Sequence, residues 1–199
     1  MTNKSIIVFD NYDSFTHNLL HLLQQVRKEY SYRVIRNNDK TIFNFQPQAL
    51  IIGPGPMTPS ETGILNEYFN KIVEPENIPV LGVCLGLQYL AHRKGIEITR
   101  STMPAHGAAT EIKHLNTELF LGVKDSFLGA RYNSLEVHKS KIEADPDLKL
   151  IAWASENDAA MSFHYKQKPW TGVQFHPESF LTSEGAKVID NFFKQYVEV

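Results

Sequence analysis

The apolar positions in the first half of the chain change their periodicity in a regular way. Short continuous apolar runs, typical of strands buried on both faces, alternate with stretches in which apolar residues recur every three or four positions, as in helices. Such alternation predicts a parallel sheet covered by helices. The predicted strands lie at residues 6–9, 32–35, 49–52 and 78–81, and the predicted helices at 15–26, 64–73 and 87–92.

The pattern changes after Gly95, a residue typical of helix C-termini. Short runs rich in β-branched and aromatic residues follow, and they predict antiparallel strands that extend or flank the sheet. We therefore predict an α/β fold with a central, mostly parallel sheet flanked by helices, and with extra antiparallel strands in the second half. These strands are expected at 96–100, 110–114, 134–138, 148–154, 160–165 and 171–175, before a last helix from about Ser183.

Composition and charge narrow the functional classes. With 199 residues, of which 42% are hydrophobic and 21% charged, the chain fits one globular domain, expected to span residues 1–199. A net charge of −2 gives no electrostatic basis for binding nucleic acid or an anionic membrane, and the apolar runs are too short to span a bilayer. Residues 1–4 do not resemble a secretory leader, and a single cysteine fits a reducing compartment, so we expect a cytoplasmic protein.

The only cysteine, Cys84, lies where a predicted strand turns sharply into a predicted helix. It is the centre of residues 82–86, which read GVCLG. A G-x-C-x-G segment in this context predicts a nucleophile elbow, because the glycines permit a cramped turn and a helix N-terminus stabilises a thiolate. On this pentapeptide alone, a buried structural cysteine is an equally good interpretation.

A cysteine nucleophile needs a base, and the base needs an acceptor that orients it. His176 and Glu178 lie two residues apart at the end of a predicted strand, where a period of two places both side chains on the same side. Pro177 between them cannot continue a strand ladder. For such a pair in isolation, a surface turn is the alternative. Glu136 and His138 have the same spacing but lie within a predicted strand, so they are a weaker candidate.

Acyl transfer also needs hydrogen-bond donors for the oxyanion. A nucleophile elbow supplies one from the residue after the nucleophile, here Leu85, and a second from a neighbouring loop. Gly55 is the candidate for the second, since Pro54 and Pro56 have no N–H and hold it in place, although a plain rigid turn is the alternative. The sequence has no spacing of Cys and His that predicts a metal site and no phosphate-binding loop.

Three segments together resemble the class I (triad) glutamine amidotransferases, and the resemblance covers essentially the whole chain. They are residues 53–56 (GPGP), 82–88 (GVCLGLQ) and 172–179 (GVQFHPES). Within that family, residues 11–16 (NYDSFT), residues 131–135 (RYNSL) and the loop at His106 and Gly107 are similar to the small glutaminase subunit of anthranilate synthase and of aminodeoxychorismate synthase. The resemblance implies a flavodoxin-like α/β domain.

The resemblance also implies roles for individual residues. Cys84 would attack the side-chain amide of L-glutamine, His176 would act as general base and then acid, and Glu178 would orient His176. The other implied site residues are Gly55 and Leu85 for the oxyanion, and Gly55, Gln88, Ser134 and Leu135 for glutamine. The thioester would be hydrolysed to glutamate, and ammonia would pass to a synthase partner that aminates chorismate. No cofactor is expected on this chain, and magnesium is expected on the synthase partner.

The chain departs from the family pattern at three places. Leu87 and Asn133 each stand where the family has His, and Ala108-Ala109 stand where it has Lys-Thr. None is a triad member, so the chemistry is expected to survive, but the third change affects a loop that faces the synthase in the family. Two other interpretations stay open, a hydrolase or peptidase with the same Cys-His-Glu elbow and a non-catalytic subunit that regulates its partner. The choice between the two synthases depends mainly on the partner.

Overall fold

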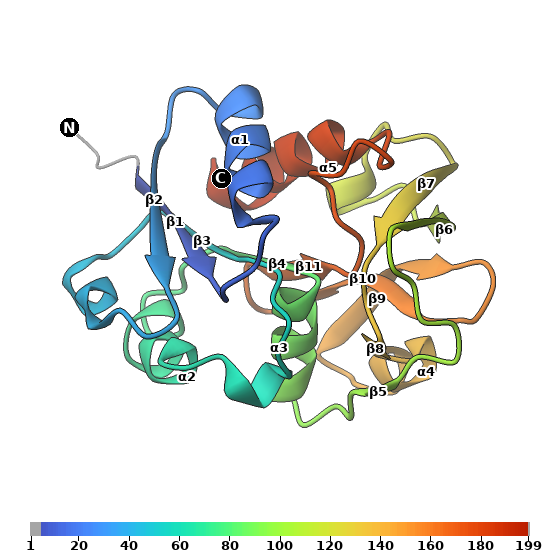
Figure 1. Ribbon diagram of the computed structural model, residues 1–199, viewed down its shortest axis with the longest axis horizontal. Coiled ribbons are helices and arrows are strands. Elements are labelled where there is room, and N and C mark those ends of the chain that lie inside the picture. The colour runs from blue at the N-terminus through green and yellow to red at the C-terminus, as the bar shows by residue number, and fades with distance from the viewer. Residues whose placement is uncertain (1–4, 199) are drawn as a thin grey trace.

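A nine-stranded sheet lies between two layers of helices in the computed structural model, which describes residues 5–198 (Figure 1). The strand order is β2-β1-β3-β4-β11-β10-β9-β6-β7. Residues 1–4, on which the expectation of no secretory leader rests, lie outside the described residues. The strands of this sheet are β1 Ser5–Asp10, β2 Ser31–Arg36, β3 Ala49–Ile52, β4 Val80–Val83, β6 Ala108–His114, β7 Ser126–Arg131, β9 Leu148–Ala154, β10 Ala160–Tyr165 and β11 Trp170–Val173.

The sheet has a parallel half and an antiparallel half. Strands β2, β1, β3, β4 and β11 run parallel to one another. The strands β10, β9, β6 and β7 continue the sheet with antiparallel pairings. A separate two-stranded sheet pairs β5 (Thr99–Arg100) with β8 (Leu135–Glu136). The predicted α/β fold, with antiparallel strands in the second half, is confirmed.

Helices cover both faces of the sheet. In β1, Ile6 and Val8 belong to the hydrophobic cluster on the side of α1 and α5, whereas Ile7 and Phe9 belong to the cluster on the side of α2 and α3. Burial on both faces explains the continuous apolar runs in the sequence. Within residues 5–198, no helix has the length and apolar character needed to cross a membrane.

The helical elements include several short 3₁₀ and π segments. The α-helices are α1 Thr16–Val26, α2 Leu65–Tyr68, α3 Leu85–Arg93, α4 Lys139–Glu143 and α5 Gly185–Phe192. The 3₁₀ segments are Lys40–Asn44, Pro59–Glu61 and Glu118–Phe120, and the π-helical segments are Phe69–Val73 and Phe193–Val197.

The structure corrects several predicted elements in the second half. Strand β7 was not predicted because Gly129 interrupts its apolar pattern; a Cβ at Gly129 would lie 2.3 Å from Ile112 Cδ1 on the neighbouring strand β6, so a side chain there would displace the end of Ile112. The strand predicted at 134–138 is only the two-residue β8, because His138 is the N-cap of α4 and accepts a hydrogen bond from the Ser140 N–H. The helix predicted at 64–73 is α-helical only to Tyr68 and continues as a π-helix.

The first turn of α3 packs against the sheet through two glycines. A Cβ at Gly82 in β4 would lie 2.4 Å from the carbonyl carbon of Gly86, and a Cβ at Gly86 would lie 2.3 Å from the Ile52 carbonyl oxygen. Both positions face backbone, which cannot move aside as a side-chain end can. The glycines of the G-x-C-x-G segment are therefore required for close packing, as the elbow prediction assumed.

We expect Gly86→Ala to lower the free energy of unfolding by about 3 kcal/mol, because the added methyl overlaps the backbone of β3. Urea unfolding measures this change. Gly95→Ala is the matched control, since no atom lies within 4 Å of its added Cβ. We expect the control to lose only about 1 kcal/mol, from placing a side chain at the positive φ of Gly95. Equal losses in the two variants would contradict the packing argument.

Candidate active site

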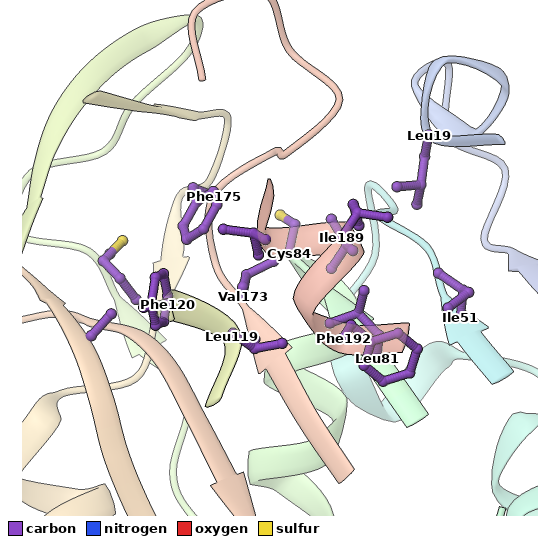
Figure 2. Close-up of a cluster of buried hydrophobic side chains, with 14 of the residues drawn as sticks. Leu19, Ile51, Leu81, Cys84, Leu119, Phe120, Val173, Phe175, Ile189 and Phe192 are labelled. Atoms are coloured by element: carbon purple, nitrogen blue, oxygen red, sulfur yellow. The ribbon is translucent and has the colours of Figure 1, made fainter. Parts of the chain in front are cut away.

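Cys84 is held in a backbone conformation that non-glycine residues rarely adopt. It follows β4 directly and is the N-cap of α3, with φ 54° and ψ −102°. Its N–H donates to the Val173 carbonyl of β11 at 2.8 Å, and it belongs to the hydrophobic cluster that includes Val173 and Ile189 (Figure 2). This geometry is the predicted nucleophile elbow, because the sharp turn separates the side chain from the strand direction.

His176 and Glu178 form a buried hydrogen-bonded pair. The distance between His176 Nδ1 and Glu178 Oε1 is 2.6 Å, and their side chains are 2% and 0% exposed. The pairing is as predicted, but its predicted cause is wrong, because β11 ends at Val173 and the pair lies in a turn. The turn is fixed by Thr182, whose hydroxyl donates to the His176 carbonyl at 2.6 Å and accepts from the Ala130 N–H at 3.0 Å.

The pKa of His176 depends on two neighbouring residues, Cys84 and Glu178. Burial by itself lowers this pKa, but the interactions of the imidazole with Cys84 and Glu178 outweigh burial and raise the pKa to about 10. His176 Nε2 makes no hydrogen bond of standard geometry to any described residue. The raised pKa favours a protonated imidazole, with the Glu178 carboxylate on its Nδ1 side.

Two aromatic rings hold the imidazole in place. The Phe15 ring lies 5.4 Å from the His176 ring and the Tyr132 ring lies 4.9 Å from it, both in edge-to-face arrangements. Phe15 and Tyr132 also contact each other, with centroids 4.7 Å apart. Both rings lie in segments that carried the family resemblance, but no pattern in the chain predicts their contact with the histidine.

A pocket of about 600 Å³ opens beside Cys84. Four other predicted site residues line it, namely Gly55, Gln88, Ser134 and Leu135. Leu85, His176 and Glu178 are buried behind the pocket rather than in its lining. The structure thus brings the eight predicted site residues to one place, although their roles stay predictions.

The two predicted oxyanion donors are neighbours. A Cβ at Gly55 would lie 2.6 Å from Leu85 Cδ2 and 2.7 Å from Asn11 Cβ, so the loop and the start of α3 are in close contact. Asn11 Nδ2 fixes the loop by donating to the Gly53 carbonyl at 3.2 Å. As the first residue of α3, Leu85 has no intrahelical acceptor for its N–H.

Gln88 is tied to the wall of the pocket by its side-chain amide. Its Nε2 donates to the Leu135 carbonyl at 2.9 Å and to Gln174 Oε1 at 3.0 Å. Asn133 Nδ2 donates to the same Leu135 carbonyl at 2.8 Å, and Arg131 Nε donates to Asn133 Oδ1 at 3.0 Å. The residue that departs from the family pattern at position 133 thus supports the glutamine-binding wall predicted at Ser134 and Leu135.

Arg131 is a buried cation that sequence reasoning missed. Its side chain is 1% exposed and lies 3.5 Å from Glu136, which also accepts hydrogen bonds from the Ser101 hydroxyl and from Asn157. Burial lowers the pKa of the Arg131 guanidinium, and the Glu136 carboxylate opposes that shift. The weaker candidate pair does not form, since Glu136 pairs with Arg131 and the His138 ring bonds to Ser140.

The other two departures are not in the site. Leu87 is fully buried in the cluster on the α2 and α3 side, where its Cβ would lie 3.0 Å from a Cβ added at Gly172. Ala108 and Ala109 are exposed at the start of β6 and pair with Arg131 and Ala130.

The chain is similar to known proteins over most of its length. A family model for class-I glutamine amidotransferases matches residues 7–196. The chain is 36% identical over 198 residues to anthranilate synthase component 2 of Pseudomonas putida, and 35% identical over 195 residues to aminodeoxychorismate/anthranilate synthase component 2 of Bacillus subtilis; each alignment covers 96% of both proteins. It spans only 32% of the length of a bifunctional protein of Thermotoga maritima, to which it is 36% identical over 192 residues.

A solved structure from Thermoplasma acidophilum, assigned to GMP synthase, has the same fold. The TM-score is 0.82 over 98% of this chain and 94% of that one, at 22% identity. This likeness concerns the fold alone.

We expect Cys84→Ala to lower the pKa of His176 below its value of about 10, because the variant removes two of the interactions that raise it. Titration of the His176 imidazole by NMR measures the change. Glu178→Gln should also lower this pKa, since it removes the other charged partner. A pKa that stays near 10 in the Cys84→Ala protein would show that the sulfur does not interact with the imidazole.

Proposed function

The chain belongs to the class-I glutamine amidotransferase family, and from this premise we propose that it is the glutaminase component of a synthase that aminates chorismate. The observation that carries the proposal is the His176–Glu178 pair, 2.6 Å apart and buried, next to a cysteine on a strained elbow. Base, orienting acceptor and nucleophile are the three parts that cysteine acyl transfer requires.

In the proposed reaction the Cys84 thiolate attacks the side-chain carbonyl carbon of glutamine, and the carbonyl oxygen becomes an oxyanion that accepts hydrogen bonds from the Gly55 and Leu85 N–H groups. His176 gives its proton to the nitrogen as the C–N bond breaks, so ammonia leaves a thioester. Neutral His176 then takes a proton from the attacking water. The C–S bond breaks, glutamate leaves and the thiolate is regenerated. This chemistry needs no cofactor on this chain, and magnesium on the synthase partner stays a prediction.

The hydrogen bonds of Gln88 suggest which end of glutamine it binds. An amide nitrogen has two hydrogens, and those of Gln88 Nε2 are used by Leu135 and Gln174. The Gln88 carbonyl oxygen is therefore the group left for substrate, and an oxygen acceptor suits the α-ammonium group. In this proposal the backbone at Ser134 and Leu135 receives the α-carboxylate end.

A protein partner is supported by the surface around the pocket. Three large apolar side chains are exposed on the loops that carry site residues: Tyr12 at 48%, Met103 at 45% and Phe180 at 91%. Tyr12 follows Asn11, Met103 lies in the loop with Ser101, and Phe180 is two residues after Glu178. We infer that these three side chains take part in the contact with the partner. The relatives carry names of both synthases, so both are candidate partners.

The reaction is tested first with Cys84→Ala. We expect glutamate release from glutamine to fall roughly 10⁴-fold or more, because the variant has no nucleophile. The measurement is glutamate formed per mole of protein, with circular dichroism confirming that the variant is folded. Retained release in the folded variant would exclude the proposed mechanism.

The partner is tested by adding each of the two synthase subunits of the same organism. We expect at least one to stimulate glutamate release; stimulation by one identifies the pathway, and stimulation by both identifies a shared glutaminase. Phe180→Ala should raise the synthase concentration for half-maximal stimulation about tenfold or more, as for a buried aromatic anchor, with little effect on release without partner.

Leu115→Ala is the matched control for the partner test. Leu115 is also exposed, at 40%, but follows the end of β6 away from the pocket. An equal effect of the two variants would show that Phe180 has no special part in the interface. No stimulation by either synthase would point to the altered loop at Ala108 and Ala109 and would reject the partner assignment while leaving the triad chemistry intact.

A further inference from the structure

Gln174 is a fully buried polar residue in contact with the nucleophile. It follows β11 directly and is 0% exposed, and its Nε2 donates to Cys84 Sγ at 3.4 Å. Its backbone N–H donates to the Met161 carbonyl at 2.9 Å, which fixes the position of the residue. A glutamine buried to this extent needs partners for its amide, and one of them is the reacting atom.

The hydrogen-bond network determines which way the Gln174 amide faces. The Leu135 carbonyl can only accept, so the Gln88 atom beside it must be the nitrogen. That same nitrogen also contacts Gln174, so Gln174 must present its oxygen to Gln88, at 3.0 Å. The Gln174 NH₂ group is then the part that faces the sulfur. The orientation thus follows from a backbone carbonyl, which has no hydrogen to donate.

We propose that Gln174 is a further catalytic residue, which holds the Cys84 sulfur by donating an N–H to it. A thiolate is a stronger acceptor than a thiol, so this bond favours the attacking form and fixes its direction. Gln88 orients the Gln174 amide, so the side chain proposed to bind glutamine is coupled to the nucleophile through a single residue. The coupling to glutamine rests on the proposed function, whereas the contact with the sulfur does not.

Charged groups also act on the sulfur, and their effects must be distinguished from the effect of the Gln174 hydrogen bond. Among the described residues, His176 and Arg131 have charge interactions with Cys84. Neither is bonded to the Gln174 side chain, whose partners are Cys84 and Gln88. A substitution at position 174 therefore removes a sulfur contact and leaves both cations in place.

The test uses Gln174→Met, which has similar length but no N–H. Because the chain has one cysteine, alkylation by iodoacetamide reports on Cys84 alone and needs no glutamine site. We expect the alkylation rate at neutral pH and the kcat for glutamate release each to fall roughly ten- to a hundredfold, the range for a hydrogen bond to a charged group. The acidic limb of the alkylation profile should move to higher pH, which a purely structural role would not cause. Values within twofold of the unsubstituted protein, in a folded variant, would overturn the proposal.

Gln174→Glu is the matched variant, because it keeps an oxygen acceptor for Gln88 and replaces the donor that faces the sulfur. We expect a loss of alkylation rate at least as large at neutral pH. When the carboxyl is protonated at low pH, the rate relative to the unsubstituted protein at the same pH should recover, because the protonated group can again donate to the sulfur. A glutamate variant as reactive as the unsubstituted protein at neutral pH would contradict the proposal.

A measurement on the unsubstituted position completes the test. The side-chain amide resonance of Gln174 should shift in Cys84→Ala protein, because its acceptor is gone, and an unchanged resonance would overturn the proposal even if both Gln174 variants failed to fold. If the unsubstituted chain released no glutamate, the proposed function would fail, while the alkylation and NMR results would still decide the role of Gln174.

Discussion

The backbone at Cys84 has a conformation that costs about 1–3 kcal/mol for a residue with a side chain, and the site depends on that strain being held. A sharp turn at φ 54° persists because the elements on both sides are fixed. Gly82 and Gly86 let α3 contact the backbone of β3 and β4, and the Cys84 N–H is bonded to β11. A larger residue at either glycine would separate helix from sheet and release the turn.

The parallel strands bring the other groups to the same edge. Asn11, Gly55, Cys84 and His176 follow the carboxyl ends of β1, β3, β4 and β11, which run parallel. Carboxyl ends of parallel strands meet at one edge of a sheet, and ligand sites of open α/β sheets form there. The Gly55 loop, the Cys84 turn and His176 therefore converge because of strand direction, although they are far apart in the chain.

The antiparallel half supplies the other wall. The Ala130 carbonyl of β7 accepts from the His176 N–H at 2.9 Å, and Arg131 at the end of β7 starts the network beneath the pocket. Burying the Arg131–Glu136 pair is costly, and several further hydrogen bonds offset that cost. The hydrogen bonds make a continuous connection from the loop at Met103 to Cys84. It runs through Arg131, Asn133, Leu135, Gln88 and Gln174.

Local patterns along the chain were enough to predict the elements whose signals are local. Apolar runs identified the strands of the parallel half, since burial on both faces leaves a continuous pattern, and the G-x-C-x-G segment identified the elbow, since close packing allows only glycine at Gly82 and Gly86. The tertiary structure decided what depends on distant neighbours. Strand β7 exists because β6 pairs with it, His176 meets Glu178 because Thr182 fixes a turn, and Gln174 and Arg131 reach the site because separate strands end beside it. Hydrogen-bond partners tens of residues apart leave no periodic signal along the chain, so only the folded structure could reveal them.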